Sequence, residues 1–161
     1  MKLRTILLLT AFLITLCCSR AYCAPLSCPS LADVKTTISK LVGKQEVDGI
    51  VAAGITWTAH TKEFFTQEDA NSVSLSFNEA KLNPTEEGSI KTAIICRYNT
   101  GNVYGGIDFT TRGVAVAVES DHNWAHYSGF YEGIAGDILY CGPGYYYSAA
   151  TTPNECTFNT F

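Results

Sequence analysis

Two histidines, His122 and His126, stand four residues apart in the segment 119–126 and are the best candidates for metal or acid–base chemistry. This spacing puts two imidazoles on one face of a helix or strand, with Glu119 or Asp121 nearby as a further ligand. However, the His-Glu-x-x-His motif of zinc proteases is absent, and turns rich in Asp, His and Asn are common without a ligand. We therefore expect a turn followed by a strand, with no metal and no cofactor.

Other catalytic patterns are weaker. A cysteine nucleophile would need a free thiolate beside a histidine, whereas disulfides explain cysteines in an exported chain. The chain has no Gly-x-Ser-x-Gly elbow. Acid pairs such as Asp108 with Glu119 suit a glycosidase only at a fixed separation, which the sequence does not define. A small secreted hydrolase using His122 and His126 is therefore the alternative function, and a non-enzymatic domain is favoured.

The N-terminus has the layout of a secretory signal. Residues 1–4 are basic and residues 5–16 are mostly apolar, a run shorter than the roughly 20 residues that span a bilayer. Cleavage after Ala21 would leave five cysteines, and cleavage after Cys23 would leave four. Because an even set can pair completely, we favour a signal peptide over 1–23 and one globular domain over 24–161. The expected location is secreted or periplasmic.

The four remaining cysteines, Cys28, Cys96, Cys141 and Cys156, allow three pairings. Cys141 and Cys156 bracket a segment rich in Gly and Pro, which predicts a loop that needs a clamp. We therefore predict a disulfide between these two residues, and a second one between Cys28 and Cys96.

The charge of the chain limits its partners. The full chain has a net charge of −4, and loss of Lys2, Arg4 and Arg20 with the signal makes it −7. An acidic domain without a Lys/Arg cluster gains nothing from counterion release, so we expect no nucleic-acid binding. Binding to an anionic membrane after signal cleavage is disfavoured for the same reason. The sequence sets no oligomeric state.

Aromatic residues crowd the second half of the chain. Tyr145, Tyr146 and Tyr147 are consecutive in a Gly-rich loop, and three consecutive rings cannot all point into one core. Exposed tyrosines suit recognition of proteins or glycans. We therefore expect a protein or glycan partner at these residues and at the neighbouring Trp124 and Tyr127; alternatively, the rings cover the end of a sheet.

A capped amphipathic helix is predicted near the start of the mature domain. Ser30 precedes apolar residues at helical spacing from Leu31 to Val42, with Asp33 in the first turn and Gly43 past the end.

Strand patterns follow the helix. Apolar and polar residues alternate over 55–59 and 73–77, which predicts two half-buried strands. The segments 93–98 and 103–109 flank the Gly-containing loop 99–102 and predict a hairpin.

The apolar run 114–118 predicts a central strand covered by the helix on one side. Further strands are expected at 124–131 and 138–141, separated by 133–136. The predicted fold is α+β: one N-terminal helix packed on an antiparallel sheet of about five to seven strands, stapled by disulfides.

Spaced cysteines and aromatic residues run along most of the mature chain: Cys28-Pro29, Trp57, Cys96-Arg97-Tyr98, Trp124, Tyr140-Cys141 and Cys156-Thr157-Phe158. Their order resembles that of small exported bacterial proteins grouped as a domain of unknown function. The resemblance implies an exported, disulfide-linked domain, and it supplies no catalytic residues.

Overall fold

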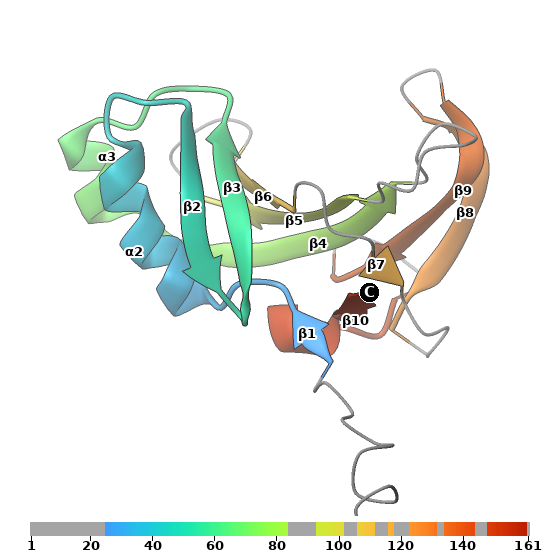
Figure 1. Cartoon of the computed structure of the whole chain (residues 1–161). Helices are drawn as coiled ribbons and strands as arrows, with labels where there is room; N and C mark the ends of the chain where they lie inside the picture. The colour runs from blue at the N-terminus through green and yellow to red at the C-terminus, as the bar shows by residue number, and fades with distance from the viewer. Residues whose placement is uncertain are drawn as a thin grey trace, which may run out of the picture.

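The computed structural model describes residues 25–83, 93–101, 106–111, 116–117, 123–131, 134–143 and 148–160. These residues form two sheets, two α-helices and a short 3₁₀ helix (Figure 1). In chain order the elements are β1 (Leu26–Ser27), α2 (Leu31–Leu41), β2 (Glu46–Ala52), β3 (Ile55–Thr61), α3 (Gln67–Ser72), β4 (Ser76–Asn83), β5 (Ala93–Asn99), β6 (Ile107–Thr110), β7 (Val116–Ala117), β8 (Ala125–Tyr131), β9 (Ile134–Cys141), η1 (Pro153–Glu155) and β10 (Thr157–Thr160).

The larger sheet has seven strands in the order β2-β3-β6-β5-β4-β9-β8, and the smaller one has the order β1-β10-β7. Every pairing between these strands is antiparallel. The large sheet curves from β2 and β3 on one side to β8 and β9 on the other (Figure 1). The predicted α+β class, the N-terminal helix and the antiparallel sheet are therefore confirmed.

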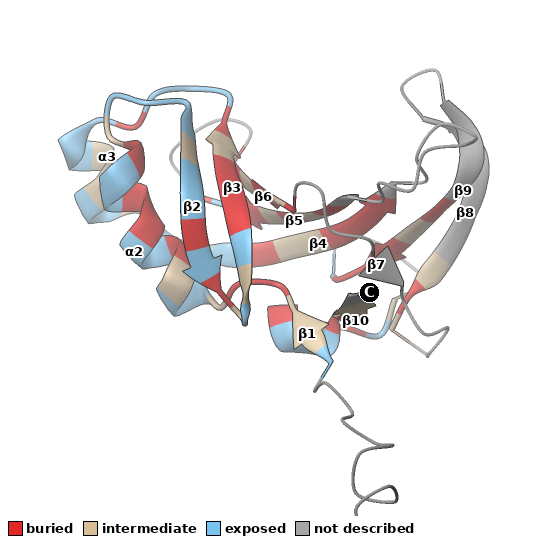
Figure 2. Cartoon of the chain, in the orientation of Figure 1, coloured by how far each residue is buried: buried red, intermediate tan, exposed pale blue. Residues whose placement is uncertain are grey.

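Helix α2 begins where its capping residues predict. The Ser30 hydroxyl accepts a hydrogen bond from the Asp33 backbone N–H, and the Asp33 carboxylate accepts one from the Ser30 N–H, which completes a capping box. Val34, Ile38 and Leu41 lie on one face of the helix and are buried in the core (Figure 2). The apolar spacing therefore identified the buried face correctly.

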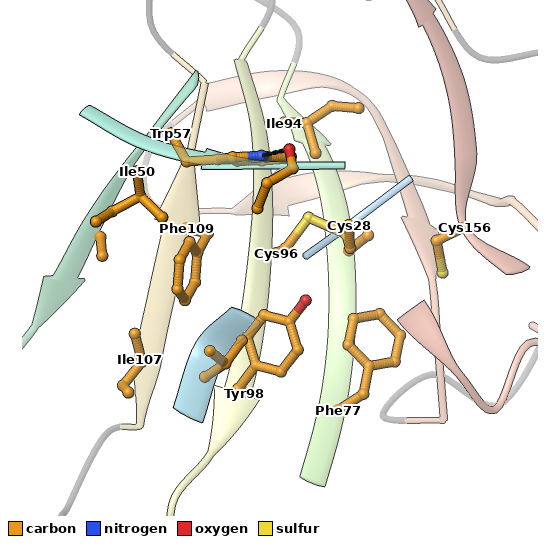
Figure 3. Close-up of a cluster of buried hydrophobic side chains, with 14 of the residues drawn as sticks. Cys28, Ile50, Trp57, Phe77, Ile94, Cys96, Tyr98, Ile107, Phe109 and Cys156 are labelled. Carbon is orange, nitrogen blue, oxygen red and sulfur yellow. Dashed lines mark hydrogen bonds between the residues drawn. A yellow bond between two sulfur atoms is a disulfide. The ribbon is translucent and has the colours of Figure 1, made fainter. Parts of the chain in front are cut away.

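One face of the large sheet, here called the core face, packs the main hydrophobic cluster. Trp57, Tyr98 and Phe109 come from three neighbouring strands and are buried (Figure 3). The Trp57 ring contacts Phe158 of β10 edge to face, with 6.2 Å between centroids. The Tyr98 hydroxyl donates a hydrogen bond to the Pro29 carbonyl oxygen, so it ties β5 to the start of α2. The core is thus closed by α2 and by the small sheet.

Both predicted disulfides are present. Cys28 bonds to Cys96, and Cys141 bonds to Cys156. Cys28 directly follows β1 and Cys156 directly precedes β10, the two strands that pair in the small sheet. Ala80 of β4 is in register with both Cys96 and Cys141. The two disulfides therefore start from one row of the large sheet and hold both ends of the domain onto it.

Three strand predictions need correction. In the apolar run 114–118, only Val116–Ala117 is described as a strand, and it lies at the edge of the small sheet. An apolar run predicts burial but does not define strand partners. The predicted strand 73–77 begins only at Ser76, because α3 extends to Ser72. The segment 133–136 was predicted to separate two strands, but β9 already begins at Ile134 and includes most of it.

The missed helix α3 has a signature that the sequence contains. The Thr66 hydroxyl accepts a hydrogen bond from the Asp69 N–H, and the Asp69 carboxylate accepts one from the Thr66 N–H. The Thr66 hydroxyl also donates to the Asp69 carboxylate over 2.7 Å, and this bond, together with the one from the Thr66 N–H, keeps the pKa of Asp69 below its usual value. The Thr-x-x-Asp spacing was therefore a readable helix start.

Candidate functional site

One serine hydroxyl accepts hydrogen bonds from backbone groups on both sides of the three consecutive tyrosines. The Gly142 N–H donates to the Ser148 Oγ over 2.9 Å, and the Ala150 N–H donates to the same oxygen over 3.2 Å. The Ser148 hydroxyl in turn donates to the Asn123 carbonyl oxygen over 2.7 Å. We call Gly142, Ser148, Asn123 and Glu155 the loop base. The chain on either side of Tyr145–Tyr147 is therefore fixed to a single point.

Asn123, which precedes β8, and Glu155 make the remaining hydrogen bonds of the loop base. The Asn123 side-chain amide donates to the Glu155 carbonyl oxygen over 3.0 Å. The Glu155 carboxylate accepts the backbone N–H groups of Thr151 and Thr152, which lowers the pKa of Glu155. With the Cys141–Cys156 disulfide, these bonds anchor both ends of the segment 142–155.

Gly142 is required at this position for two reasons. Its φ of +130° lies outside the range that side-chain-bearing residues favour, and an added Cβ would lie 2.8 Å from the Asn78 carbonyl oxygen. We expect Gly142→Ala to lower the free energy of unfolding by about 3 kcal/mol, through backbone strain and overpacking.

Gly49→Ala is the matched control, because Gly49 also has a positive φ but has open space around its Cβ position. We expect it to cost about 1 kcal/mol. Urea denaturation of both variants measures the difference, and equal losses would contradict the packing of Gly142 against β4.

A row of polar residues crosses the opposite face of the large sheet, here called the outer face. Glu46, His60, Asp108, Arg97 and Glu79 are direct cross-strand neighbours on β2, β3, β6, β5 and β4. The Glu46 carboxylate lies 3.0 Å from the His60 Nδ1. Arg97 donates to both oxygens of Asp108, over 2.8 and 2.9 Å, and to Glu79 over 3.2 Å. We call these five residues the polar row.

The polar row pairs three carboxylates with one guanidinium and one imidazole, so it keeps an excess of negative charge. One guanidinium bridges two carboxylates, an arrangement that makes strong, directional hydrogen bonds. Burial raises the pKa of Glu79 above its ordinary value, although attraction to Arg97 and Lys81 opposes the rise. A carboxylate beside an imidazole, as in Glu46 and His60, orients the ring. These contacts link β2 to β3, and they join β4, β5 and β6 to one another.

The raised pKa of Glu79 predicts how stability depends on pH. The folded state binds more protons than the unfolded state between the ordinary and the raised pKa. Stability therefore falls as pH rises through this window and is level above it. We expect Glu79→Gln to remove this contribution, so that the wild type loses stability relative to the variant as the pH rises from 4 to 8. Glu68→Gln, an exposed change on α3, is the control.

The urea midpoints of the wild type, Glu79→Gln and Glu68→Gln, measured across this pH range, test this prediction. A difference between the wild type and Glu79→Gln that does not change with pH would contradict the burial of this carboxylate.

Of the predicted binding residues, the structure describes Trp124 and the backbone of Tyr127. Trp124 lies beside the loop base and its Nε1–H donates to the Thr157 carbonyl oxygen over 2.9 Å. Trp124 is buried, so its ring supports the loop base and offers little surface to a ligand. Tyr127 lies on β8, in register with Ile138. Tyr145, Tyr146 and Tyr147 lie outside the described residues.

The histidines do not form one group in the described part of the chain. His126 lies on β8, in register with Leu139, and His122 lies outside the described residues. His60 lies on β3, five positions along the sheet order from β8, and its side chain contacts Glu46 on the outer face. Among the described residues, no three His, Cys, Asp or Glu side chains gather as metal ligands would.

Sequence reasoning missed the polar row. Each of its members stands at a polar position of a strand, which the alternation shows, but the register that aligns them across five strands is not written in any one segment.

No family model, curated protein or solved structure significantly matches this chain. Neither α-helix in the described ranges is long and apolar enough to cross a membrane. The two disulfides indicate an oxidising compartment. What the chain is shown to be is a small, disulfide-bonded, β-rich α+β domain.

Proposed function

We propose that this protein is an exported, non-enzymatic binding module whose tyrosines Tyr145, Tyr146 and Tyr147 contact a protein or glycan. The observation that carries the proposal is the loop base, where Gly142 and Ser148 are hydrogen-bonded to each other. Loops held by a rigid scaffold are the usual carriers of recognition residues. A loop fixed at both ends loses less conformational entropy on binding, and this favours affinity.

In the polar row, His60 is paired with Glu46, and Arg97 is shared between Asp108 and Glu79. Cross-strand pairs of opposite charge are typical of groups that stabilise a sheet. The hydrolase alternative around His122 and His126 stays a prediction, because no described contact adds to it.

The proposed export is supported by the disulfides. Small exported domains commonly use disulfides to supplement their core, and here both disulfides fasten the terminal strands. We propose a secreted or periplasmic location after removal of residues 1–23, as the resemblance to small exported bacterial proteins implies.

The test is binding of the purified, oxidised protein to a glycan array and to a panel of immobilised extracellular proteins. A triple variant, Tyr145→Ala/Tyr146→Ala/Tyr147→Ala, should bind at least about tenfold more weakly, the loss that about 1.4 kcal/mol of contact energy represents. Its melting temperature should stay close to that of the wild type. Phe64→Ala is the control, since Phe64 is an exposed aromatic residue outside the loop.

Two results would overturn the proposal. The triple variant could bind as well as the wild type, or it could lose as much stability as a core variant, which would show that the tyrosines cover the sheet.

A further inference from the structure

In the part of the chain that the structure describes, strand β8 forms an edge of the large sheet and has none of the usual protection of an edge. Among the described residues it pairs only with β9, over seven consecutive residues and without a bulge. Its sequence, Ala125–Tyr131, contains no Lys, Arg, Asp, Glu or Pro. Natural edge strands are commonly protected by charges, prolines or bulges because their free N–H and C=O groups can pair with another chain.

The opposite edge is protected in just these ways. Strand β2 carries Glu46 and Asp48, and its pairing with β3 has a register shift between Val47 and Ile50. Helix α2 also contacts β2. Only one edge of this sheet is therefore suited to strand addition in the described part of the chain.

About half of the β8–β9 hairpin also extends beyond the residues of β9 that pair with β4. Strand β9 pairs with β4 only from Leu139 to Cys141, whereas it pairs with β8 from Ile134 to Tyr140. In the described structure the outer part of the hairpin is thus a two-stranded ribbon. Such a ribbon is marginally stable alone, and a third strand stabilises it.

The sequence of β8 is complementary to itself when two copies run antiparallel about Ser128. Ala125 then stands opposite Tyr131, and Tyr127 stands opposite Gly129. Each of these pairs combines a small residue with a tyrosine, and an aromatic residue across from a glycine is a favourable cross-strand pair. No like charges meet along the strand, although the chain as a whole is acidic. This match favours a second copy over an unrelated strand.

We propose that the protein forms a twofold-symmetric homodimer in which β8 pairs antiparallel with β8 of a second copy, centred on Ser128. The two large sheets then join into one continuous sheet. Because β2 is protected, the assembly closes at two copies and does not grow into a fibre. The inference depends on the edge of β8 and not on the proposed binding function.

Size-exclusion chromatography with light scattering on the oxidised protein at about 100 µM, a concentration at which a dimer with a micromolar dissociation constant is nearly complete, tests the proposal. The expected result is a dimer. A monomer at this concentration would overturn it.

The variant Ser128→Lys separates β8 from other interfaces. Within one chain the new lysine stands in register with Asp137, which favours the hairpin, but across the twofold axis it meets its own copy. Like charges directly opposite destabilise strand pairing, so the dimer should weaken by about tenfold. Val51→Lys places the same charge on the exposed face of the other edge strand and should leave the dimer intact. A dimer unchanged by Ser128→Lys, or weakened equally by both, would refute β8 pairing.

A covalent readout follows from the geometry of antiparallel pairs. Directly opposite residues have Cα atoms about 4.5–5.5 Å apart, within the range that disulfides bridge. Ser128→Cys should therefore yield a disulfide-linked dimer in which the thiols of two copies are oxidised by dissolved oxygen. Val51→Cys should remain unlinked, and the reverse result would contradict the proposed axis.

Discussion

Replacing Cys28 and Cys96 together by alanine should lower the free energy of unfolding by about 4 kcal/mol, the value that loop-closure entropy predicts for a long loop. The two residues are 68 apart in sequence and are fully buried. Their bond holds the chain between β1 and α2 against the middle of the large sheet. Its loss leaves the start of the domain held by non-covalent contacts such as the Tyr98 hydrogen bond to Pro29.

The Cys141–Cys156 disulfide closes a shorter loop, and the cost of its removal can be compared with that of Cys28–Cys96. Cys141 and Cys156 are only 15 residues apart, so their replacement should cost about 3 kcal/mol. Denaturant midpoints of both double variants, measured under the same conditions, make the test. A larger loss from the shorter loop would contradict this ranking.

Trp57→Ala should cost about 4 kcal/mol, because it removes the largest fully buried side chain of the core. The variant leaves a cavity against Phe158 of the small sheet. It also leaves the Ala52 carbonyl oxygen without the hydrogen bond that the indole Nε1 donates over 2.9 Å.

Trp57→Phe separates these two contributions. Phenylalanine keeps most of the apolar contact and lacks the donor, so its cost should be less than half that of alanine. Chemical denaturation of both variants measures the costs. Equal losses would show that the hydrogen bond, and not the packing of the ring, dominates at this position.

Helix α2, the Cys141–Cys156 disulfide and the β5–β6 hairpin could be predicted from the sequence, because each depends on residues close together in the chain. The Ser30–Asp33 capping box and the apolar spacing of α2 identified the helix. The Gly- and Pro-rich segment between Cys141 and Cys156 identified one disulfide, and the second pair followed from it. The hairpin of β5 and β6 was likewise predicted from its turn residues.

Features that depend on register between distant segments could not be predicted. The polar row requires five strands to align Glu46, His60, Asp108, Arg97 and Glu79, and a one-residue slip would move any of them to the core face. The same holds for the placement of β7 beside β10, since an apolar strand pairs equally well in either sheet.

The described fold explains why the terminal strands need covalent anchors. β1 has two residues and β10 has four, and strands this short contribute few ladder hydrogen bonds. Phe158 nevertheless fills the core beside Trp57. The disulfides hold these short strands in place, which keeps the core closed and anchors the segment 142–155.

Peptide mapping without reductant, on protein recovered separately from the cells that make it and from their medium, tests the account most directly. Cys28 directly follows β1 and Cys156 directly precedes β10, next to the paired residues Ser27 and Thr157, so exchanged partners are the nearest alternative. The account predicts a chain that begins at Ala24, the two linkages Cys28–Cys96 and Cys141–Cys156, and no free thiol. A linkage between Cys28 and Cys156, or a fully reduced chain that retains residues 1–23, would contradict it.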